Sequence, residues 1–235
     1  MKIFLFLAGL TLLPLCAGVS WALADIIQMI RPESLQTLPP AFWWLSGGFG
    51  LWLFCWFVLP RPIRSYVLAH ELTHAFWGLL MGSRVLNMRV SKRGGAVKLS
   101  KSNFVISLAP YFFPLYTMLL VVLYLIIQIF YDLSAWYGPW LGLVGVTWGF
   151  HLTFTIYALA QHQSDVHQYG RLFSYSIIYL LNIIGLGLWI TAVTPVTLEQ
   201  WAQTSGEHTV RSYRFMWAGT TYLAQKTQNY LPRRN

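Results

Sequence analysis

The stretch YVLAHELTHAFWGLLMG, from Tyr66 to Gly82, places two histidines and a glutamate within an otherwise apolar run of residues. It contains no proline, and Gly82 stands where a glycine often ends a helix, so we expect a helix from 65 to 81. An ionisable side chain within a membrane span costs about 2.5–3.5 kcal/mol on insertion scales. Three such side chains so close together therefore indicate a shared purpose, although a helix lying on lipid headgroups with a polar face would also tolerate them.

The chain around this stretch is apolar enough to be a membrane protein. Of its 235 residues, 56% are hydrophobic and only 10% are charged. Stretches long enough for the roughly 20 apolar residues of a span occur at 3–23, 41–59, 104–130, 136–160 and 172–193. The helix from 65 to 81 is somewhat short for a full crossing. We predict a mainly α, multi-pass integral membrane protein of a bacterial-type inner or plasma membrane, a polytopic transmembrane bundle of about five to six membrane helices.

The basic residues favour the lipid bilayer as a partner rather than nucleic acid. Of the 16 lysines and arginines, six lie between residues 84 and 101 and five between 211 and 234, next to predicted spans. The two cysteines, Cys16 and Cys55, both fall inside predicted spans. They therefore supply neither a disulfide framework nor a zinc-finger pattern.

Three segments follow from this pattern. We expect N-terminal membrane helices over 1–59, a membrane core that carries the HELTH motif over 60–194, and a basic, aromatic C-terminal tail over 195–235. The first apolar run is long enough to be an uncleaved anchor, although it also fits a secretory signal. If that run crosses outward, Arg61 and Arg64 return to the cytoplasmic side with the motif. The basic tail would then lie outside, so the orientation stays open.

Two irregular features flank the motif. Leu86, Met88 and Val90 alternate with polar residues, and alternation resumes after Gly94-Gly95, which predicts a β-hairpin with the glycines in its turn. An isolated hairpin is marginal in water, so this one is expected to rest on the membrane domain. Further on, SLAPYFFPLY carries prolines at 110 and 114, which predict a kinked or broken helix of the kind that lines a cavity.

The HELTH motif places its ionisable groups where a zinc hydrolase needs them. Residues four apart share one helix face, so His70 and His74 can direct both imidazoles at one Zn²⁺ ion. Glu71 is offset by about 100 degrees on the helix and can act as general base toward a water molecule that the metal acidifies. His70 and His74 are thus the candidate metal ligands, and Glu71 is the candidate catalytic residue.

A catalytic zinc site normally takes a third protein ligand. The extended form of the motif would need glycine at 77 and histidine at 80, where this chain has Trp77 and Leu80, and no glutamate occurs between Glu71 and Glu199. Of the remaining carboxylates, only Asp165 is predicted at the inner end of a span. Asp165 is the preferred third ligand, and three histidines compete with it: His151, His162 and His167. His151 lies within a predicted span and is a candidate for stabilising an oxyanion or for orienting a metal ligand through a hydrogen bond.

These features resemble the site-2 protease family of intramembrane zinc metallopeptidases. The resemblance covers about residues 60–190 and rests on HELTH followed by AFWGLLMG, the hairpin, the SLAPYFFP span and the aspartate of SDVHQYGR. It implies that His70, His74 and Asp165 bind Zn²⁺ and that Glu71 is the base. It also implies that the hairpin from Val85 to Leu99 holds an unwound substrate along a strand edge formed by apolar residues: Val85, Leu86, Met88, Val97 and Leu99.

The chain departs from the family pattern at two places. Asp165 stands in Ser164-Asp165-Val166, whereas the family aspartate usually stands in a sequence close to LDG. The LAPYFFP segment has prolines but lacks the asparagine that many members have, so His151 is expected to take a polar role there.

The sequence thus predicts a zinc-dependent intramembrane endopeptidase that cleaves in or near transmembrane segments of other membrane proteins. A strand edge suits this task, because unwinding a transmembrane helix releases backbone groups that strand addition can satisfy. One alternative is a non-catalytic membrane protein with a structural metal site or a surface for a partner helix. A second is a transporter that uses His70, Glu71, His151 and Asp165 as a proton or metal relay.

Overall fold

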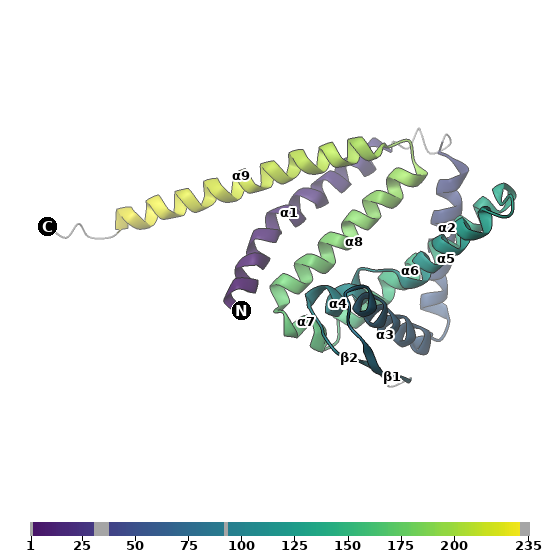
Figure 1. Ribbon diagram of the computed structural model, residues 1–235. Helices are drawn as coiled ribbons and strands as arrows, with labels where there is room; N and C mark the ends of the chain where they lie inside the picture. The colour runs from purple at the N-terminus through teal and green to yellow at the C-terminus, as the bar shows by residue number, and fades with distance from the viewer. Residues whose placement is uncertain (1, 31–37, 92–93, 231–235) are drawn as a thin grey trace. The chain divides into compact units, whose positions relative to one another are not determined.

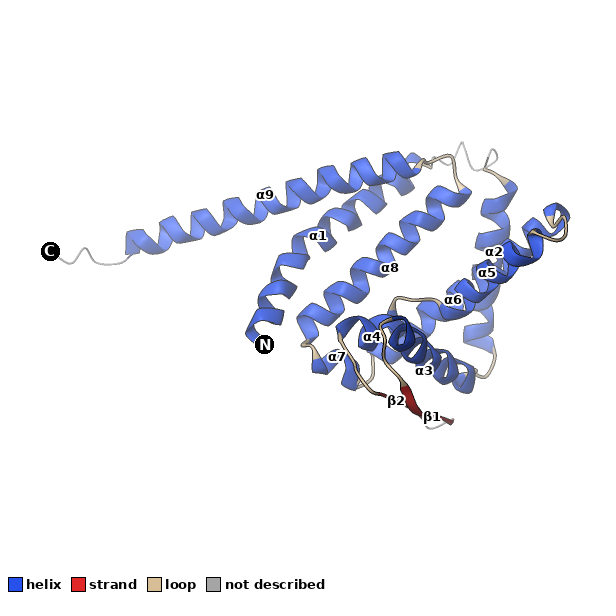
Figure 2. Ribbon diagram, in the orientation of Figure 1, coloured by secondary structure: helices blue, strands red, loops and turns tan. Residues whose placement is uncertain are grey.

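The computed structural model describes residues 2–30, 38–91 and 94–230 and is mainly helical (Figure 1). The helices are α1 (Lys2–Met29), α2 (Pro40–Val58), α3 (Ile63–Leu80), α4 (Phe104–Leu108), α5 (Leu115–Gln128), α6 (Tyr137–Leu159), α7 (Ser164–Gln168), α8 (Arg171–Val193) and α9 (Leu198–Tyr230). Two short 3₁₀ turns, η2 (Ala109–Tyr111) and η3 (Ser134–Trp136), and a hairpin of β1 (Val85–Ser91) and β2 (Gly94–Leu99) complete the described elements. Figure 2 shows the two strands of the hairpin in red and the helices in blue.

The described helices confirm a multi-pass membrane protein. Four segments are long and apolar enough to cross a membrane: α1, α2, α8 and Ser134–Leu159, which is α6 with the preceding turn η3. A fifth crossing results if α4 and α5, which are bent by 84° at the intervening break, form one span. The described residues thus contain five candidate spans at most. The 18-residue helix α3 is not one of these spans.

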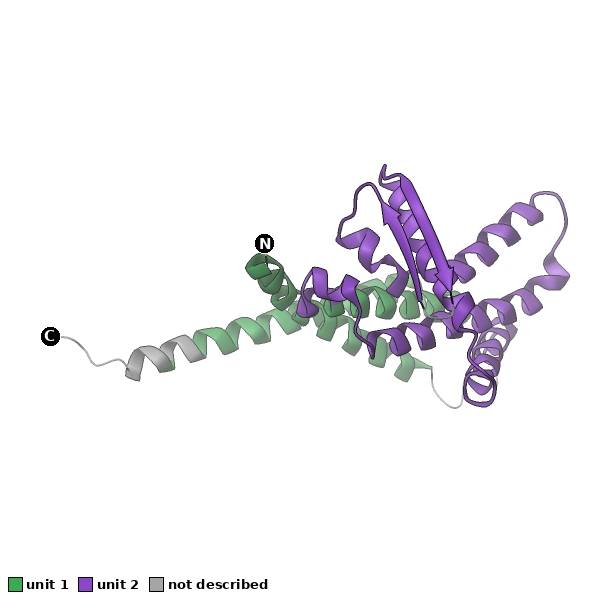
Figure 3. Cartoon of the chain, turned by 90° about the horizontal axis from the view of Figure 1, so that it is seen from below, with its two compact units in different colours: residues 1–36, 175–235 green, residues 37–174 purple. Residues whose placement is uncertain are grey.

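The chain divides into two compact units, coloured separately in Figure 3. The first comprises residues 1–36 and 175–235, and the second comprises residues 37–174. The division of the chain at 59 and 194 that the sequence suggests stays a prediction.

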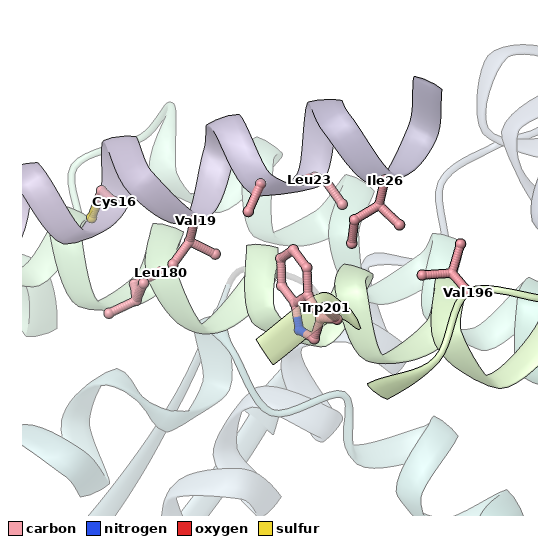
Figure 4. Close-up of a cluster of buried hydrophobic side chains, with 8 residues drawn as sticks. Cys16, Val19, Leu23, Ile26, Leu180, Val196 and Trp201 are labelled. Carbon is pink, nitrogen blue, oxygen red and sulfur yellow. The ribbon is translucent and has the colours of Figure 1, made fainter. Parts of the chain in front are cut away.

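The first unit is held by apolar packing of α1 with α8 and α9. The buried cluster in Figure 4 comprises Cys16, Val19, Ala22, Leu23, Ile26, Leu180, Val196 and Trp201. Polar contacts add to it, since His208 Nε2 lies 2.7 Å from Asp25 Oδ2 and Tyr213 donates a hydrogen bond to the Thr11 carbonyl. The segment predicted as a tail therefore forms a long helix, α9, that packs along α1.

Small residues bring α2 and α6 together in the second unit. A Cβ atom on Gly48 would collide with the Gly142 carbonyl, and one on Gly145 would collide with the Leu45 carbonyl, so both glycines allow close approach of the two backbones. Trp52 adds a hydrogen bond from its indole N–H to Thr153 Oγ1 at 2.9 Å. Phe154 of α6 stacks on Tyr66 of α3, which connects this helix pair to the helix that carries HELTH.

The helix that carries HELTH ends as the sequence predicts. Gly82 has a positive φ of 73°, the Ser83 N–H donates to the Gly78 carbonyl at 2.8 Å, and the Gly82 N–H donates to Leu79 at 3.0 Å. These two bonds form the Schellman motif that commonly ends a helix at glycine. The turn directs the chain back along α3 as the hairpin, where the Leu99 side chain fits against Gly78.

The predicted hairpin is confirmed, but its glycines are not in the turn. β1 and β2 pair antiparallel, with Ser91 opposite Gly94 and Met88 opposite Val97. Gly94 and Gly95 are therefore the first residues of β2, and residues 92–93 lie outside the described residues. A Gly-Gly pair suits a turn, but Gly95 is needed where β2 lies against α3.

The predicted break in the proline-rich span is also confirmed. The Asn103 side chain caps α4 by accepting a hydrogen bond from the Ile106 N–H at 2.9 Å. The helix then tightens into η2 at Pro110 and restarts as α5 after Pro114. The break brings the backbone of Ile106 and the side chain of Tyr111 close to α3.

Candidate metal centre

Three side chains of metal-binding type converge in the second unit. His70 and His74 come from α3, and their Nε2 atoms lie 3.2 Å apart. Asp165, in the first turn of α7, places its Oδ2 atom 3.6 Å from His70 Nε2 and 3.5 Å from His74 Nε2. Over the residues that the structure describes, this is the group of three that could hold a metal ion, with its potential ligand atoms all within 4.8 Å of one another.

The donor set fits a divalent transition metal. His74 Nδ1 must be a donor, because its partner at 2.8 Å is the Ile106 carbonyl, which can only accept. His74 therefore presents the lone pair of Nε2 to His70 and Asp165. Two imidazoles and one carboxylate are a common ligand set for zinc and leave one position of a tetrahedral site open.

The charge state of Asp165 suits the same purpose. Burial alone would raise the pKa of its carboxyl group. The hydrogen bonds and charges of His70 and His74 lower this pKa by a larger amount than burial raises it. The pKa of Asp165 consequently lies well below its usual range. The carboxylate is ionised at neutral pH, as a metal ligand must be.

Glu71 lies beside the three-residue group and is buried, with a relative exposure of 6%. Its carboxylate accepts a hydrogen bond from the Val97 backbone in β2. A Cβ atom on Gly95 would lie 2.6 Å from Glu71 Cγ and 2.7 Å from Oε1, so only glycine leaves room for this carboxylate at that position. The hairpin thus fixes where Glu71 stands relative to the histidines.

An open cavity of about 600 Å³ gives access to these groups. Its wall includes the three candidate ligands and Glu71, five residues of β2, the end of α6 and the connection to α7. The β2 residues on the wall are Gly94, Gly95, Ala96, Val97 and Leu99. One edge of the hairpin therefore borders the same cavity as the candidate metal ligands.

The residues predicted to hold a substrate are divided between the two strands. Val97 and Leu99 lie on the cavity wall. Val85, Leu86 and Met88 belong to β1 and lie outside that wall, with exposed side chains. The substrate-binding role of the hairpin stays a prediction, and the strand that could fulfil it is β2.

The competing histidines are not part of the three-residue group. His151, in α6, lines a separate cavity of about 20 Å³ together with His70 and Thr73, so its role in stabilising an oxyanion or orienting a metal ligand stays a prediction. His162 and His167 stack on each other, with ring centroids 4.3 Å apart, and neither lines the larger cavity. Asp165 is the candidate that the fold brings to the HELTH histidines.

Two tyrosines next to the ligands were not anticipated from the sequence. The Tyr111 hydroxyl donates toward Asp165 Oδ2 at 3.2 Å, and the Tyr66 hydroxyl lies 3.4 Å from His70 Nδ1. Spacing could have identified Tyr66, which is one helical turn before His70 on the same face. No local pattern links Tyr111 to Asp165, 54 positions later.

Comparisons of the chain with protein-family models, with curated proteins and with solved structures find no match. The likeness to site-2 proteases therefore rests on the sequence motifs and stays a prediction.

Proposed function

We propose that the protein is a zinc-dependent intramembrane endopeptidase that hydrolyses peptide bonds in or near transmembrane segments of other membrane proteins. The observation that carries the proposal is the convergence of His70, His74 and Asp165 in a cavity that Glu71 also lines. The multi-pass fold supplies the membrane setting.

His70, His74 and Asp165 would hold the zinc ion through Nε2, Nε2 and a carboxylate oxygen. When bound, zinc supplies Lewis-acid chemistry that acidifies water and polarises a peptide carbonyl. The Glu71 carboxylate takes a proton from the attacking water and later delivers it to the nitrogen of the leaving amine. The hydroxyl of the water goes to the carbonyl carbon, the C–N bond breaks, and the one proton that Glu71 carried goes to the amine nitrogen.

The β2 strand supports the choice of a protease over other zinc hydrolases. The Ser100 N–H donates to the Arg84 carbonyl at 2.9 Å, so the peptide groups of the preceding residue, Leu99, face away from β1, as do those of Val97 and Gly95 at intervals of two residues. An extended substrate segment pairs with this edge by strand addition, which satisfies the backbone groups released when its helix unwinds. The scissile bond is thereby held along the wall that carries Glu71.

The proposal is tested on the full chain purified in detergent. Zinc content and cleavage of a panel of single-span membrane proteins are measured for the wild type and for Glu71→Gln. We expect both proteins to bind zinc and only the wild type to cleave. Cleavage that persists in Glu71→Gln would refute the proposed mechanism, and a wild type that binds zinc without cleaving any substrate would favour a structural metal site.

A further inference from the structure

Each of the three candidate ligands has a hydrogen-bond partner outside the three-residue group. His74 donates through Nδ1 to the Ile106 carbonyl at 2.8 Å. The partners of the other two are tyrosine hydroxyls, Tyr111 for Asp165 and Tyr66 for His70. Groups that orient metal ligands from outside commonly affect metal affinity by tenfold or more.

Tyr111 connects the broken helix to the segment that carries Asp165. It ends the turn η2 and is almost completely buried, with a relative exposure of 1%. Its ring stands edge-on to His70, with centroids 5.3 Å apart, and its hydroxyl lies 3.2 Å from Asp165 Oδ2 and 3.1 Å from Gln163 Oε1. The single phenolic proton serves one acceptor at a time, and the charged carboxylate is the stronger acceptor.

Tyr66 contacts a different candidate ligand, His70. Its ring stacks on Phe154 of α6, with centroids 4.7 Å apart and planes within 4°, so packing fixes the ring. Its hydroxyl lies 3.4 Å from His70 Nδ1. For His70 to offer the Nε2 lone pair to a metal, Nδ1 must carry the proton, and the phenolic oxygen can accept it.

We propose that Tyr111 and Tyr66 are positioning residues of the metal site. Tyr111 orients the Asp165 carboxylate, and Tyr66 selects the His70 tautomer that presents Nε2. This inference rests on the proposed metal site, and it concerns hydroxyl groups alone. Phenylalanine at either position would preserve the ring packing and remove only the hydrogen bond.

The test uses the full chain in detergent, stripped of metal by a chelator and titrated with Co²⁺, whose visible spectrum reports ligand geometry. Tyr111→Phe and Tyr66→Phe are compared with the wild type. We expect Tyr111→Phe to weaken Co²⁺ binding by about 10- to 100-fold and to alter the spectrum, and Tyr66→Phe to weaken binding by about tenfold. Tyr116→Phe is the matched control, because the Tyr116 hydroxyl donates to the Ser65 carbonyl and not to one of the three candidate ligands.

Affinity and spectrum in both variants equal to those of Tyr116→Phe would overturn the inference, as would a wild type that binds neither Co²⁺ nor Zn²⁺. A wild type that binds metal but cleaves no substrate removes the protease proposal alone. In that case the affinities of the tyrosine variants still decide whether the hydroxyls position the ligands. Thermal unfolding of each variant shows whether a loss of affinity reflects a loss of fold.

Discussion

Replacement of Gly95 by alanine perturbs the contact through which the hairpin holds Glu71. The added Cβ atom would lie 2.6 Å from Glu71 Cγ, 2.7 Å from Glu71 Oε1 and 2.7 Å from Val67 Cγ1. Ordinary contacts of this kind are 3.4 Å or longer, so strand and side chain must separate. The backbone of Gly95 does not have a positive φ, so alanine is not strained for a conformational reason.

Overpacking of this size costs about 1–3 kcal/mol. The movable partner is the Glu71 side chain, so the cost falls either on the position of the base or on the contact of β2 with α3. If it falls on the base, a change of about 1.4 kcal/mol lowers kcat/KM about tenfold. Zinc content should not change, because the atoms that the added Cβ would meet belong to Glu71 and Val67 and not to the three candidate ligands.

The assay is cleavage of a single-span substrate, with zinc content and thermal unfolding measured in parallel. Gly50→Ala is the control, since a Cβ atom there would meet nothing within 4 Å. We expect Gly95→Ala to lose activity at least tenfold while Gly50→Ala keeps it. Wild-type activity and stability in Gly95→Ala would refute the contact between β2 and Glu71 as a functional feature.

Variants of Gly145, of two histidines and of Val97 test other features of the structure. Gly145→Ala should lower the thermal midpoint, because its Cβ atom would collide with the Leu45 carbonyl, whereas Gly47→Ala, with open space around it, should not. His151→Leu and His162→Ala should both retain bound zinc, as neither residue belongs to the three-residue group, and loss of zinc in either would indicate a fourth protein ligand and a structural site. Val97→Pro should reduce cleavage by more than tenfold with zinc retained, because proline removes the N–H that Glu71 accepts from, and unchanged cleavage would contradict that bond.

Features with a local cause are predictable from the sequence. The helix that carries HELTH, its end at Gly82, the break at Pro110 and Pro114, and the apolar spans all depend on residues close together in the chain. The hairpin is predictable from its alternation. The sequence places Gly94 and Gly95 in its turn, because the close approach of Gly95 to α3 is a tertiary contact without a local signal.

Features that depend on tertiary contacts are less predictable. Asp165 could be chosen only by its position at the end of a span, and its three competitors could be set aside only once the fold brought Asp165, and none of them, into the group with His70 and His74. Tyr111 has no sequence signal, because its hydrogen bond to Asp165 joins two segments that meet only in the folded chain. The length of α9 also escaped prediction, because a basic, aromatic segment fits a helix or an irregular tail equally well.

The most direct test of the central claim is a measurement of bound zinc in the purified wild type, in Asp165→Ala and in Asp132→Ala. Asp132 is an exposed aspartate whose carboxylate accepts from the Ser134 N–H at 2.9 Å, outside the candidate site. We predict about one tightly bound zinc ion per chain in the wild type and in Asp132→Ala, and its loss from Asp165→Ala. Equal zinc in all three proteins, or none in the wild type after loading, would contradict a metal centre formed by His70, His74 and Asp165.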